Sequence, residues 1–347
     1  MVGNHIERFK KTLRMNVLIT GINGGLGINT AIKLVEKGYN VIGYGHPTTD
    51  FNPVLNDIVY IEGDFRDRKE LKKALEMADI IFHFGGITGF GHLLSDYVSS
   101  NILGLTNILD IINEEKLKIR KIIFASSSAV YGEGEYHCPN HGVLYPKCRK
   151  IDSLKNKEWE YCCDICSSNI FPSATKESKP LTNQHIYAIT KKTCENILNE
   201  FSKMHDIIVI TLRYSILYGQ YQNKGIIPLF IKKMQDSEEI QLHEDGCQIR
   251  DFIYLEDAAE ISLKVMSKVM VSDTLNVSSS QPTSINLLID TISDISKLTA
   301  RSKVLNNYRD GDIRHIYLDN HKLLNFIDYS FTDLRTGLKN MKGNLYG

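Results

Sequence analysis

A glycine-rich turn near the start of the chain constrains the fold more than any other feature. The turn reads Thr20-Gly21-Ile22-Asn23-Gly24-Gly25-Leu26-Gly27 and follows a short apolar strand pattern, Asn16 to Thr20. A helix pattern from Ile28 to Lys37 comes next, then Gly38 and a second strand pattern from Tyr39 to Tyr44. These elements predict a βαβ unit in which backbone N–H groups and the helix dipole can hold a pyrophosphate. An ordinary tight turn is the alternative.

Strand and helix patterns continue to alternate after this unit, which is typical of an α/β fold with a parallel sheet. We therefore expect a Rossmann-type, doubly wound parallel sheet. The expected further elements are strands at Ile58 to Glu62, Ile80 to Phe84, Lys121 to Ala125 and Ile207 to Arg213, and helices at Arg68 to Met77, Leu94 to Asn113 and Ile186 to Met204.

The regular alternation is interrupted once and then changes character, which suggests the domain organisation. Residues 1–14 form a polar arm, and residues 15–215 form the nucleotide-binding domain. Residues 133–184 are too long and irregular for a plain connection, so we interpret them as a Cys-rich insertion. Residues 216–347 mix short helices and strands and are expected to form mainly a smaller C-terminal α/β lobe that binds substrate.

Composition narrows the class of partner. Lys plus Arg and Asp plus Glu both total 41, so the net charge gives no reason to expect a nucleic-acid or membrane partner. No apolar run approaches the roughly 20 residues that cross a bilayer, and residues 1–14 lack a signal-peptide core. We therefore expect a soluble, cytoplasmic protein.

Tyr187 and Lys191 are the leading catalytic candidates. Their spacing at the start of a predicted helix puts both side chains on one face. An ammonium near a phenol favours the phenolate, so Lys191 is expected to lower the pKa of Tyr187. Ser127 follows the strand pattern that ends at Ala125, where a hydroxyl would face the cofactor crevice. Taken alone, the Tyr187/Lys191 spacing and the serine run at Ser127 are both common patterns, and the serines could simply belong to an ordinary loop.

Several short motifs occur in a fixed order along the chain, and together they are more specific than any one of them. They are Thr20 to Gly27, Gly63-Asp64-Phe65-Arg66-Asp67, Phe82-His83-Phe84-Gly85-Gly86, Asn101-Ile102-Leu103-Gly104-Leu105-Thr106-Asn107, Ser126 to Gly132, Tyr187 to Lys191, and Arg250-Asp251-Phe252. The chain resembles the extended short-chain dehydrogenase/reductases of the NAD-dependent epimerase/dehydratase family, over nearly all of its length after the arm. By that resemblance it is an enzyme that uses bound NAD.

The turn and the resemblance together give an expected cofactor site. Its members are Gly21, Asn23, Gly24, Gly25, Leu26, Gly27, His46, Asp64, Phe65, Phe84, Gly85, Gly86, Asn101 and Lys191. The acid that usually bonds the adenosine ribose after the second strand is absent, because Gly45 stands in its place. No arginine follows there to hold a 2′-phosphate, and His46 could serve either cofactor. NAD is preferred, and NADP stays open.

The residues after Ser127 bear on the reaction. Family dehydratases typically have an Asp-Glu pair there, and related decarboxylases keep the glutamate, whereas this chain has Ser128 and Ala129. The resemblance therefore favours a nucleotide-sugar 4-epimerase with a transient 4-keto intermediate. An NAD(P)H-dependent 4-keto-sugar reductase is the main alternative, followed by a 4,6-dehydratase and a cofactor-binding protein without catalysis.

The family pattern also suggests how the nucleotide diphosphate of the substrate is held. Arg250 and Arg309 are expected to bind it, with Ser128 close to the sugar; arginine suits phosphate geometrically. Surface salt bridges are the alternative for both arginines. Ile216 stands where many relatives have a substrate-binding asparagine.

The Cys-rich insertion contains two short hooks, Cys138-Pro139-Asn140-His141 and Cys163-Asp164-Ile165-Cys166. CxxH and CxxC turns can present four donors tetrahedrally, so Cys138, His141, Cys163 and Cys166 are expected to bind a structural Zn²⁺. Free thiols are the alternative, and Cys162 could replace Cys163. The insertion resembles that of a subgroup with dTDP-L-rhamnose 4-epimerase-like members, which implies a dTDP-deoxyhexose. The family further implies a homodimer and a role in cell-surface polysaccharide assembly.

Overall fold

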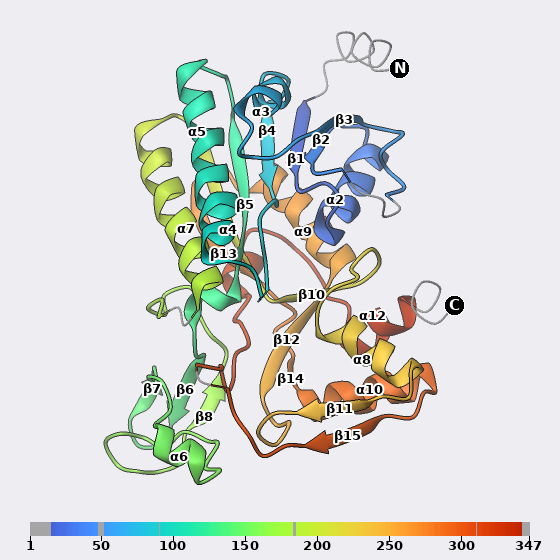
Figure 1. The fold of residues 1–347 in the computed structure, drawn as a ribbon. Coiled ribbons are helices and arrows are strands. Elements are labelled where there is room, and N and C mark those ends of the chain that lie inside the picture. Colours follow the sequence, from blue (N-terminus) through green and yellow to red (C-terminus); the bar gives the residue numbers. More distant parts are fainter. Residues whose placement is uncertain (1–14, 48–51, 90, 183–184, 310, 342–347) are drawn as a thin grey trace.

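The computed structural model describes residues 15–47, 52–89, 91–182, 185–309 and 311–341, so the predicted polar arm, residues 1–14, lies outside it. Its centre is a parallel sheet of seven strands in the order β13-β9-β5-β4-β1-β2-β3 (Figure 1). The strands are β1 (Asn16–Thr20), β2 (Asn40–Gly45), β3 (Val59–Glu62), β4 (Ile80–His83), β5 (Lys121–Ser127), β9 (Ile208–Tyr214) and β13 (Asp273–Val277). This confirms the Rossmann-type α/β fold.

Helices cover both faces of the sheet, as a doubly wound fold requires (Figure 1). One face carries α2 (Gly25–Glu36) and α9 (Leu255–Lys268), and the other carries α3 (Arg68–Leu75), α5 (Gly104–Glu114) and α7 (Ile186–Met204). Among the described residues, no helix is long and apolar enough to cross a membrane.

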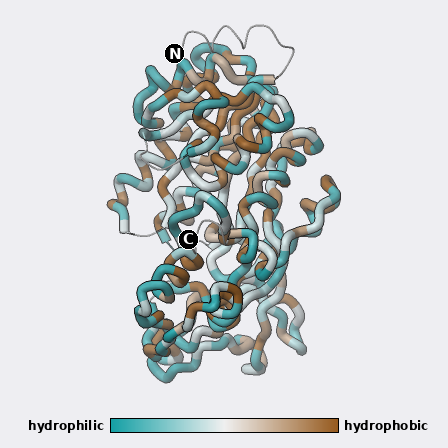
Figure 2. Tube along the Cα trace, turned by 90° about the vertical axis from the view of Figure 1, so that its right-hand side faces the viewer, coloured by the Kyte–Doolittle hydropathy of each residue, from teal (hydrophilic) through white to brown (hydrophobic). Residues whose placement is uncertain are grey.

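The alternation of side chains along each strand divides the interior into two layers. On β1, Val17 and Ile19 pack into the core under α2 and α9, whereas Leu18 packs under α3, α5 and α7. Neighbouring strands repeat the division, because successive side chains point to opposite faces. In Figure 2 the hydrophobic segments accordingly gather inside the half of the molecule that holds the sheet. Burial on both faces explains why these strands are almost continuously apolar in sequence.

The second lobe is built on smaller sheets around its own apolar cluster. A three-stranded sheet contains β10 (Ile216–Tyr218), β12 (Ile249–Tyr254) and β14 (Pro282–Ser284), and a parallel pair contains β11 (Glu239–Leu242) and β15 (Arg301–Val304). The helices of this half are α8 (Ile226–Gln235), α10 (Ile285–Ser296) and α12 (Leu334–Asn340), whereas α11 (His321–Leu324) packs against β13 and the main core.

The insertion forms a small body of its own beneath the sheet (Figure 1). Its three-stranded antiparallel sheet has β6 (Glu135–Cys138) between β7 (Gly142–Leu144) and β8 (Phe171–Ser173). A short helix, α6 (Ile151–Lys155), lies between β7 and β8 in the chain. Five buried residues make up its apolar cluster: Tyr136, Cys138, Tyr161, Cys163 and Ile170.

The long helix expected at Leu94 to Asn113 is divided. The structure has α4 (Leu94–Tyr97), a π-helical turn η1 (Val98–Leu103) and then α5. A π turn widens the helix by one residue and frees local backbone groups, and such turns are frequent at functional sites. A 3₁₀ turn, η2 (Ser128–Tyr131), follows β5.

The expected boundary at residue 215 needs a correction, since part of the C-terminal region belongs to the nucleotide-binding domain. β13 pairs with β9 at the edge of the main sheet, and α9 packs beside α2. Sequence position misled the assignment, because the chain leaves the sheet after β9 and returns to it. Lys121, on β5, holds the end of α9 against the sheet, just before the chain enters β13. Its buried ammonium donates to the carbonyls of Met266 (2.7 Å) and Val269 (2.6 Å).

Replacing Lys121 with Met should destabilise the whole nucleotide-binding domain. The methionine would leave two buried carbonyls of α9 without donors, at a cost of about 2–4 kcal/mol of unfolding free energy. Urea unfolding would measure it, with the exposed Lys118→Met variant as the control. Equal stability of the two variants would contradict the role of Lys121 in holding α9.

Candidate active site

A cavity of about 530 Å³ opens at the carboxyl edge of the sheet, beside β1 and β4. The two strands are neighbours, but the chain runs outward from them to opposite edges of the sheet, and ligands bind at such switch points. Its lining is Gly21, Asn23, Gly24, Gly45, His46, Pro47, Asp64, Phe65, Arg66, Phe84, Gly85, Gly86, Ile87, Asp96, Ser99 and Ser100.

Glycines give this cavity its floor, because the backbones around it are too close for side chains. Gly21 has φ +71°, and a Cβ on it would lie 2.7 Å from the Cα of Gly85. A Cβ on Gly85 would lie 2.1 Å from the Phe65 ring, and one on Gly27 would lie 2.4 Å from the Gly21 carbonyl oxygen. The bare turn and the N-terminus of α2 therefore present N–H groups to the cavity, which suits a pyrophosphate.

Nine of the expected cofactor residues line the cavity: Gly21, Asn23, Gly24, His46, Asp64, Phe65, Phe84, Gly85 and Gly86. The others lie outside that lining. Gly25 packs against Leu255, and the Leu26 side chain belongs to the core. Gly27 lets α2 approach the turn at Gly21 and Ile22, while Asn101 and Lys191 are buried. For all fourteen residues, cofactor binding stays a prediction.

The cavity contains an arginine that the sequence analysis did not consider. Arg66, which follows β3, donates to the Asp64 carboxylate (Nε to Oδ1, 3.0 Å), and His46 Nε2 lies 3.7 Å from Asp64 Oδ2. The hydrogen bond from Arg66 holds the pKa of Asp64 below its usual value. In the sequence no arginine follows Gly45 at the end of β2. The pairing of β2 with β3 brings Arg66 to the same place.

Ser127 and Tyr187 meet at the end of β5. Ser127 is the last residue of β5, Tyr187 lies in the first turn of α7, and their hydroxyls lie close enough to interact. Burial raises the pKa of Tyr187 to about 12, and the hydrogen bond with Ser127 acts in the opposite direction. The rings of His185 and Tyr187 stack with their centroids 6.0 Å apart. The expected proximity of Ser127 and Tyr187 is therefore found.

Lys191 lies one turn further along α7 and is buried. Its ammonium donates to the carbonyl of Ala125 at 2.7 Å and lies 4.8 Å from the centre of the Phe124 ring. Burial lowers the pKa of Lys191 to about 8. We expected Lys191 to lower the pKa of Tyr187, but the group that does so here is Ser127.

Asn101 is held beneath the cavity by the π turn η1. Its amide accepts from the Ile87 N–H (2.7 Å) and donates to the Ile87 carbonyl (3.1 Å) and to Thr190 (3.0 Å). The backbone carbonyl of Asn101 accepts instead from the thiol of Cys194 on α7. Asn101 thus ties the loop after β4 to α7.

A second cavity of about 260 Å³ adjoins Ser127. Its lining is Ser127, Ser128, Ala129, His185, Ser215, Ile216, Arg250, Asp251, Gly311, Asp312, Ile313, Ile316, Tyr317 and Leu318. Ser127, Ser128 and Arg250 were expected near substrate, and the structure brings them together here. Residues 311–318 were missed, since nothing in their local pattern marks them as a pocket wall.

The two candidate phosphate-binding arginines differ in their surroundings. The Arg250 guanidinium donates to the carbonyls of Ile249 (2.8 Å), Arg314 (3.1 Å) and Ile313 (2.7 Å), so several of its donors are engaged. Arg309 is exposed and lies outside the described lining of the second cavity. Its role in substrate binding stays a prediction.

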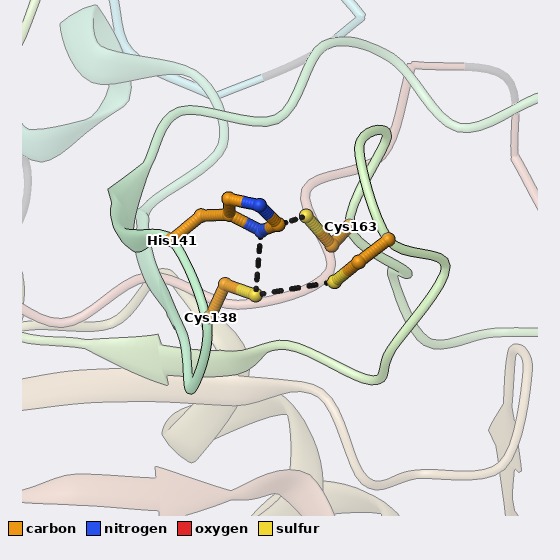
Figure 3. Close-up of side chains that lie close together, drawn as sticks. Cys138, His141 and Cys163 are labelled. Carbon is orange, nitrogen blue, oxygen red and sulfur yellow. Dashed lines mark hydrogen bonds between the residues drawn. The ribbon is translucent and has the colours of Figure 1, made fainter.

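The four expected metal ligands come together in the insertion. Their donor atoms all lie within 4.8 Å of one another, and Figure 3 shows the labelled Cys138, His141 and Cys163 pointing toward a common centre. Nδ1 of His141 lies 3.6 Å from Cys138 Sγ and 3.5 Å from Cys163 Sγ, and the sulfurs of Cys138 and Cys166 are 3.7 Å apart. A tetrahedral zinc site with S and N ligands needs edges of about 3.5–3.8 Å.

Cys162, the alternative to Cys163, has a different environment. Its thiol faces the side chain of Asn169 at 3.7 Å, in an isolated bridge between the two residues. Cys163 is buried, whereas Cys162 is exposed. The geometry therefore selects Cys163 for the cluster.

Comparison with known proteins agrees with this architecture. The model of the NAD dependent epimerase/dehydratase family matches residues 17–148 and 160–278. The chain is 26% identical over 327 residues to a dTDP-L-rhamnose 4-epimerase of Burkholderia thailandensis. The aligned region covers 87% of each of the two chains. It is 27% identical over 334 residues to a putative UDP-glucose 4-epimerase of Methanocaldococcus jannaschii, covering 93% of this chain and 96% of that one.

A solved structure has the same fold. It is a UDP-glucuronic acid 4-epimerase from Bacillus cereus in complex with UDP-glucuronic acid and NAD. The TM-score is 0.77 at 22% identity, and the match covers 95% of this chain and 99% of that one.

Replacing Asp64 with Asn should improve the binding of NADP relative to NAD by about tenfold. The change removes a negative charge from the cavity and frees Arg66 and His46 for a 2′-phosphate. Calorimetric titration with both dinucleotides would measure the ratio of dissociation constants. Asp57→Asn, outside the cavity lining, is the control, and an unchanged ratio in Asp64→Asn would refute this role of Arg66.

Proposed function

The chain belongs to the NAD dependent epimerase/dehydratase family, and on that premise we propose that it is a nucleotide-sugar 4-epimerase that works with bound NAD. Two similar proteins are named as 4-epimerases, one for a dTDP sugar and one, as a putative activity, for UDP-glucose. The glycine-floored cavity has the shape and the N–H donors that a dinucleotide requires.

One observation carries the proposal of epimerisation. Ser127 and Tyr187 lie close together beside the second cavity, and the next two positions on its wall are Ser128 and Ala129. The pair can exchange a proton with a sugar hydroxyl. A dehydratase would need an acid to eliminate water, and these two positions supply a hydroxyl and a methyl group instead.

Each residue of the site has a distinct role in the proposed reaction. Bound NAD would supply reversible hydride acceptance at C4 of the sugar. Tyr187, as phenolate, takes the proton of the 4-hydroxyl, so that a 4-keto sugar forms, and returns it after the sugar has turned over. The Ser127 hydroxyl donates a hydrogen bond to the reacting oxygen. The buried Lys191 places a positive charge beneath the cofactor site, and Asn101 holds the loop that borders it.

The second cavity favours a sugar with an apolar edge. Ile216, Ile313, Ile316 and Leu318 line it, and Ile216 replaces an amide that many relatives use. The Arg250 guanidinium in its lining already donates to three backbone carbonyls, so a sugar carboxylate would find few free N–H donors there. We therefore propose a neutral deoxyhexose as substrate, attached to dTDP as in the named Burkholderia relative.

A 4-keto-sugar reductase is the second candidate, because of the cofactor cavity. Gly45 leaves room where an acid would exclude a 2′-phosphate, and Arg66 and His46 lie nearby. Exchangeable NADPH would suit such an enzyme. It would consume reduced cofactor stoichiometrically, whereas an epimerase returns the hydride to its substrate.

We further propose that Cys138, His141, Cys163 and Cys166 bind a structural Zn²⁺. The donor set is one that zinc prefers, and three of the separations between donors, 3.5, 3.6 and 3.7 Å, match the edges of such a tetrahedron. Four protein ligands leave no open coordination position, so the metal would stabilise the insertion and take no part in the sugar chemistry.

A homodimer is proposed through α5 and α7, which lie side by side on one flank of the sheet (Figure 1). A groove of about 490 Å³ lies between them, lined mainly by apolar area from residues such as Leu109, Ile197, Phe201 and Met204. The Met204 side chain is 72% exposed, and a second copy of the helix pair would cover it.

The purified protein should interconvert two 4-epimeric nucleotide sugars without added cofactor. Chromatography of products from a panel of dTDP- and UDP-sugars would test this, and a dTDP-deoxyhexose should react fastest. Tyr187→Phe should retain bound NAD but lose turnover by about 10²–10⁴-fold. Product formation only in proportion to added NADPH would establish the reductase instead.

Ser127→Ala should move the acid limb of the pH–rate profile to higher pH by about one unit. The hydrogen bond from Ser127 favours the phenolate, so its loss raises the pKa of Tyr187 and less base is present at a given pH. Ser128→Ala, next on the cavity wall, is the matched control. Identical limbs in both variants would contradict the role of Ser127 in tuning Tyr187.

Metal analysis should find one zinc per chain in the wild-type protein. Cys163→Ser should lose most of it, while the adjacent Cys162→Ser should keep it, because only Cys163 belongs to the cluster. Plasma emission spectrometry after exhaustive dialysis would measure both. Full zinc content in the Cys163→Ser protein would exclude ligation by that thiol.

A further inference from the structure

Residues 312–318, the pocket-wall segment, form one side of the second cavity and lie between the insertion and the second lobe. Asp312, Ile313, Ile316, Tyr317 and Leu318 line the cavity. The segment is joined to β12 by the Ile316 N–H, which donates to the Ile249 carbonyl at 3.1 Å. On its other side the Thr175 N–H, from the end of the insertion, donates to the Tyr317 carbonyl at 2.9 Å.

Two residues of the segment, Arg314 and His315, are absent from the cavity lining and face the insertion and second lobe instead. Arg314 is fully buried. Its guanidinium contacts Glu160 of the insertion through Nε (3.0 Å) and Glu244 and Asp245 of the second lobe through Nη1 (2.9 and 2.7 Å). His315 Nε2 lies 2.8 Å from the same Glu160 carboxylate. The insertion and the second lobe thus share one buried arginine.

Glu133, at the start of the insertion, binds the backbone of the same two residues. Its buried carboxylate accepts from the N–H groups of Arg314 (2.8 Å) and His315 (2.6 Å). It also accepts from the hydroxyls of Tyr136 (2.8 Å) and Tyr161 (3.2 Å). Four donors around one buried carboxylate leave it well satisfied, and charge-assisted hydrogen bonds of this kind are strong.

The two tyrosines connect Glu133 to the metal cluster. Tyr136 lies two residues before Cys138, and Tyr161 lies two residues before Cys163, so each hook of the cluster follows one of them closely. Their rings pack edge to face with centroids 5.2 Å apart. The apolar cluster of the insertion is small, with five buried residues and two partly buried ones, and small cores of this kind gain stability from a cross-link.

We propose that the metal-binding insertion positions the pocket-wall segment for substrate, with Glu133 and Arg314 as positioning residues and the bound metal keeping Tyr136 and Tyr161 on Glu133. The inference rests on the proposed epimerase function in so far as the second cavity holds the nucleotide sugar. The first cavity, where NAD is proposed to bind, has no residue of the insertion in its lining. The insertion should therefore affect substrate affinity and leave cofactor binding unchanged.

The first test is kinetic and uses conservative variants. Tyr161→Phe removes one hydroxyl from Glu133, and Glu133→Gln removes its charge. Both should raise KM for the nucleotide sugar, by about 5-fold and at least 10-fold respectively, with kcat within about 2-fold and bound NAD unchanged. Tyr145→Phe is the control, since Tyr145 faces Lys179 and not Glu133. Wild-type KM in both Tyr161→Phe and Glu133→Gln would overturn the proposal.

The second test needs no turnover, so it separates a failure of this inference from a failure of the proposed function. Trypsin should cleave after the buried Arg314 only when the pocket-wall segment is released. Removal of metal by a chelator, or the Tyr161→Phe change, should accelerate this cleavage at least 5-fold, measured by mass spectrometry relative to cleavage at the exposed Arg309. Equal protection of Arg314 in metal-bound and metal-free protein would show that the metal does not position the segment.

Discussion

The structure depends on the close approach of two backbones, at Gly21 after β1 and Gly85 after β4. A Cβ at Gly21 would lie 2.7 Å from Gly85, so neither strand end could stay where it is if a side chain stood between them. Phe65 closes the same point from the other side, since Gly85 and Gly104 both leave space for its ring. The floor of the cofactor cavity, the start of α2 and the position of β4 follow from this contact. The tight packing also explains why glycines occur in three motifs that lie far apart in the sequence.

Features that depend on local pattern were predictable from the sequence. Six of the seven strands of the sheet, all except β13, follow from hydrophobic period. The glycine turn and the proximity of Ser127 to Tyr187 follow from turn chemistry and from the rule that parallel strands end at one edge. The resemblance to the family is confirmed by the family match. Spacing also indicated the four members of the Cys/His cluster, but it could not choose between Cys162 and Cys163. That choice depends on which thiol the chain turns inward.

Features that depend on distant pairing were not predictable in this way. Arg66 reaches the cofactor cavity because β2 and β3 are neighbours, and Glu133 meets Arg314 across 181 positions of sequence. Neither contact leaves a periodic signal. The π turn at Asn101 was missed for a different reason, since its residues are compatible with an ordinary helix and the widening is imposed by contacts with Ile87 and Cys194. Tertiary contacts override local preference at such points.

The return of the chain to the main sheet at β13 has a consequence for the order in which the protein folds during synthesis. β9 is complete once the ribosome has passed Tyr214, but its outer edge stays unpaired until Val277 has emerged. An open, apolar strand edge is a template for pairing with other chains. The nascent protein must therefore pass through a stage in which its largest sheet is exposed at one side, while the second lobe is still being made. A chaperone that covers the β9 edge at that stage would raise the yield of folded protein without touching the finished molecule.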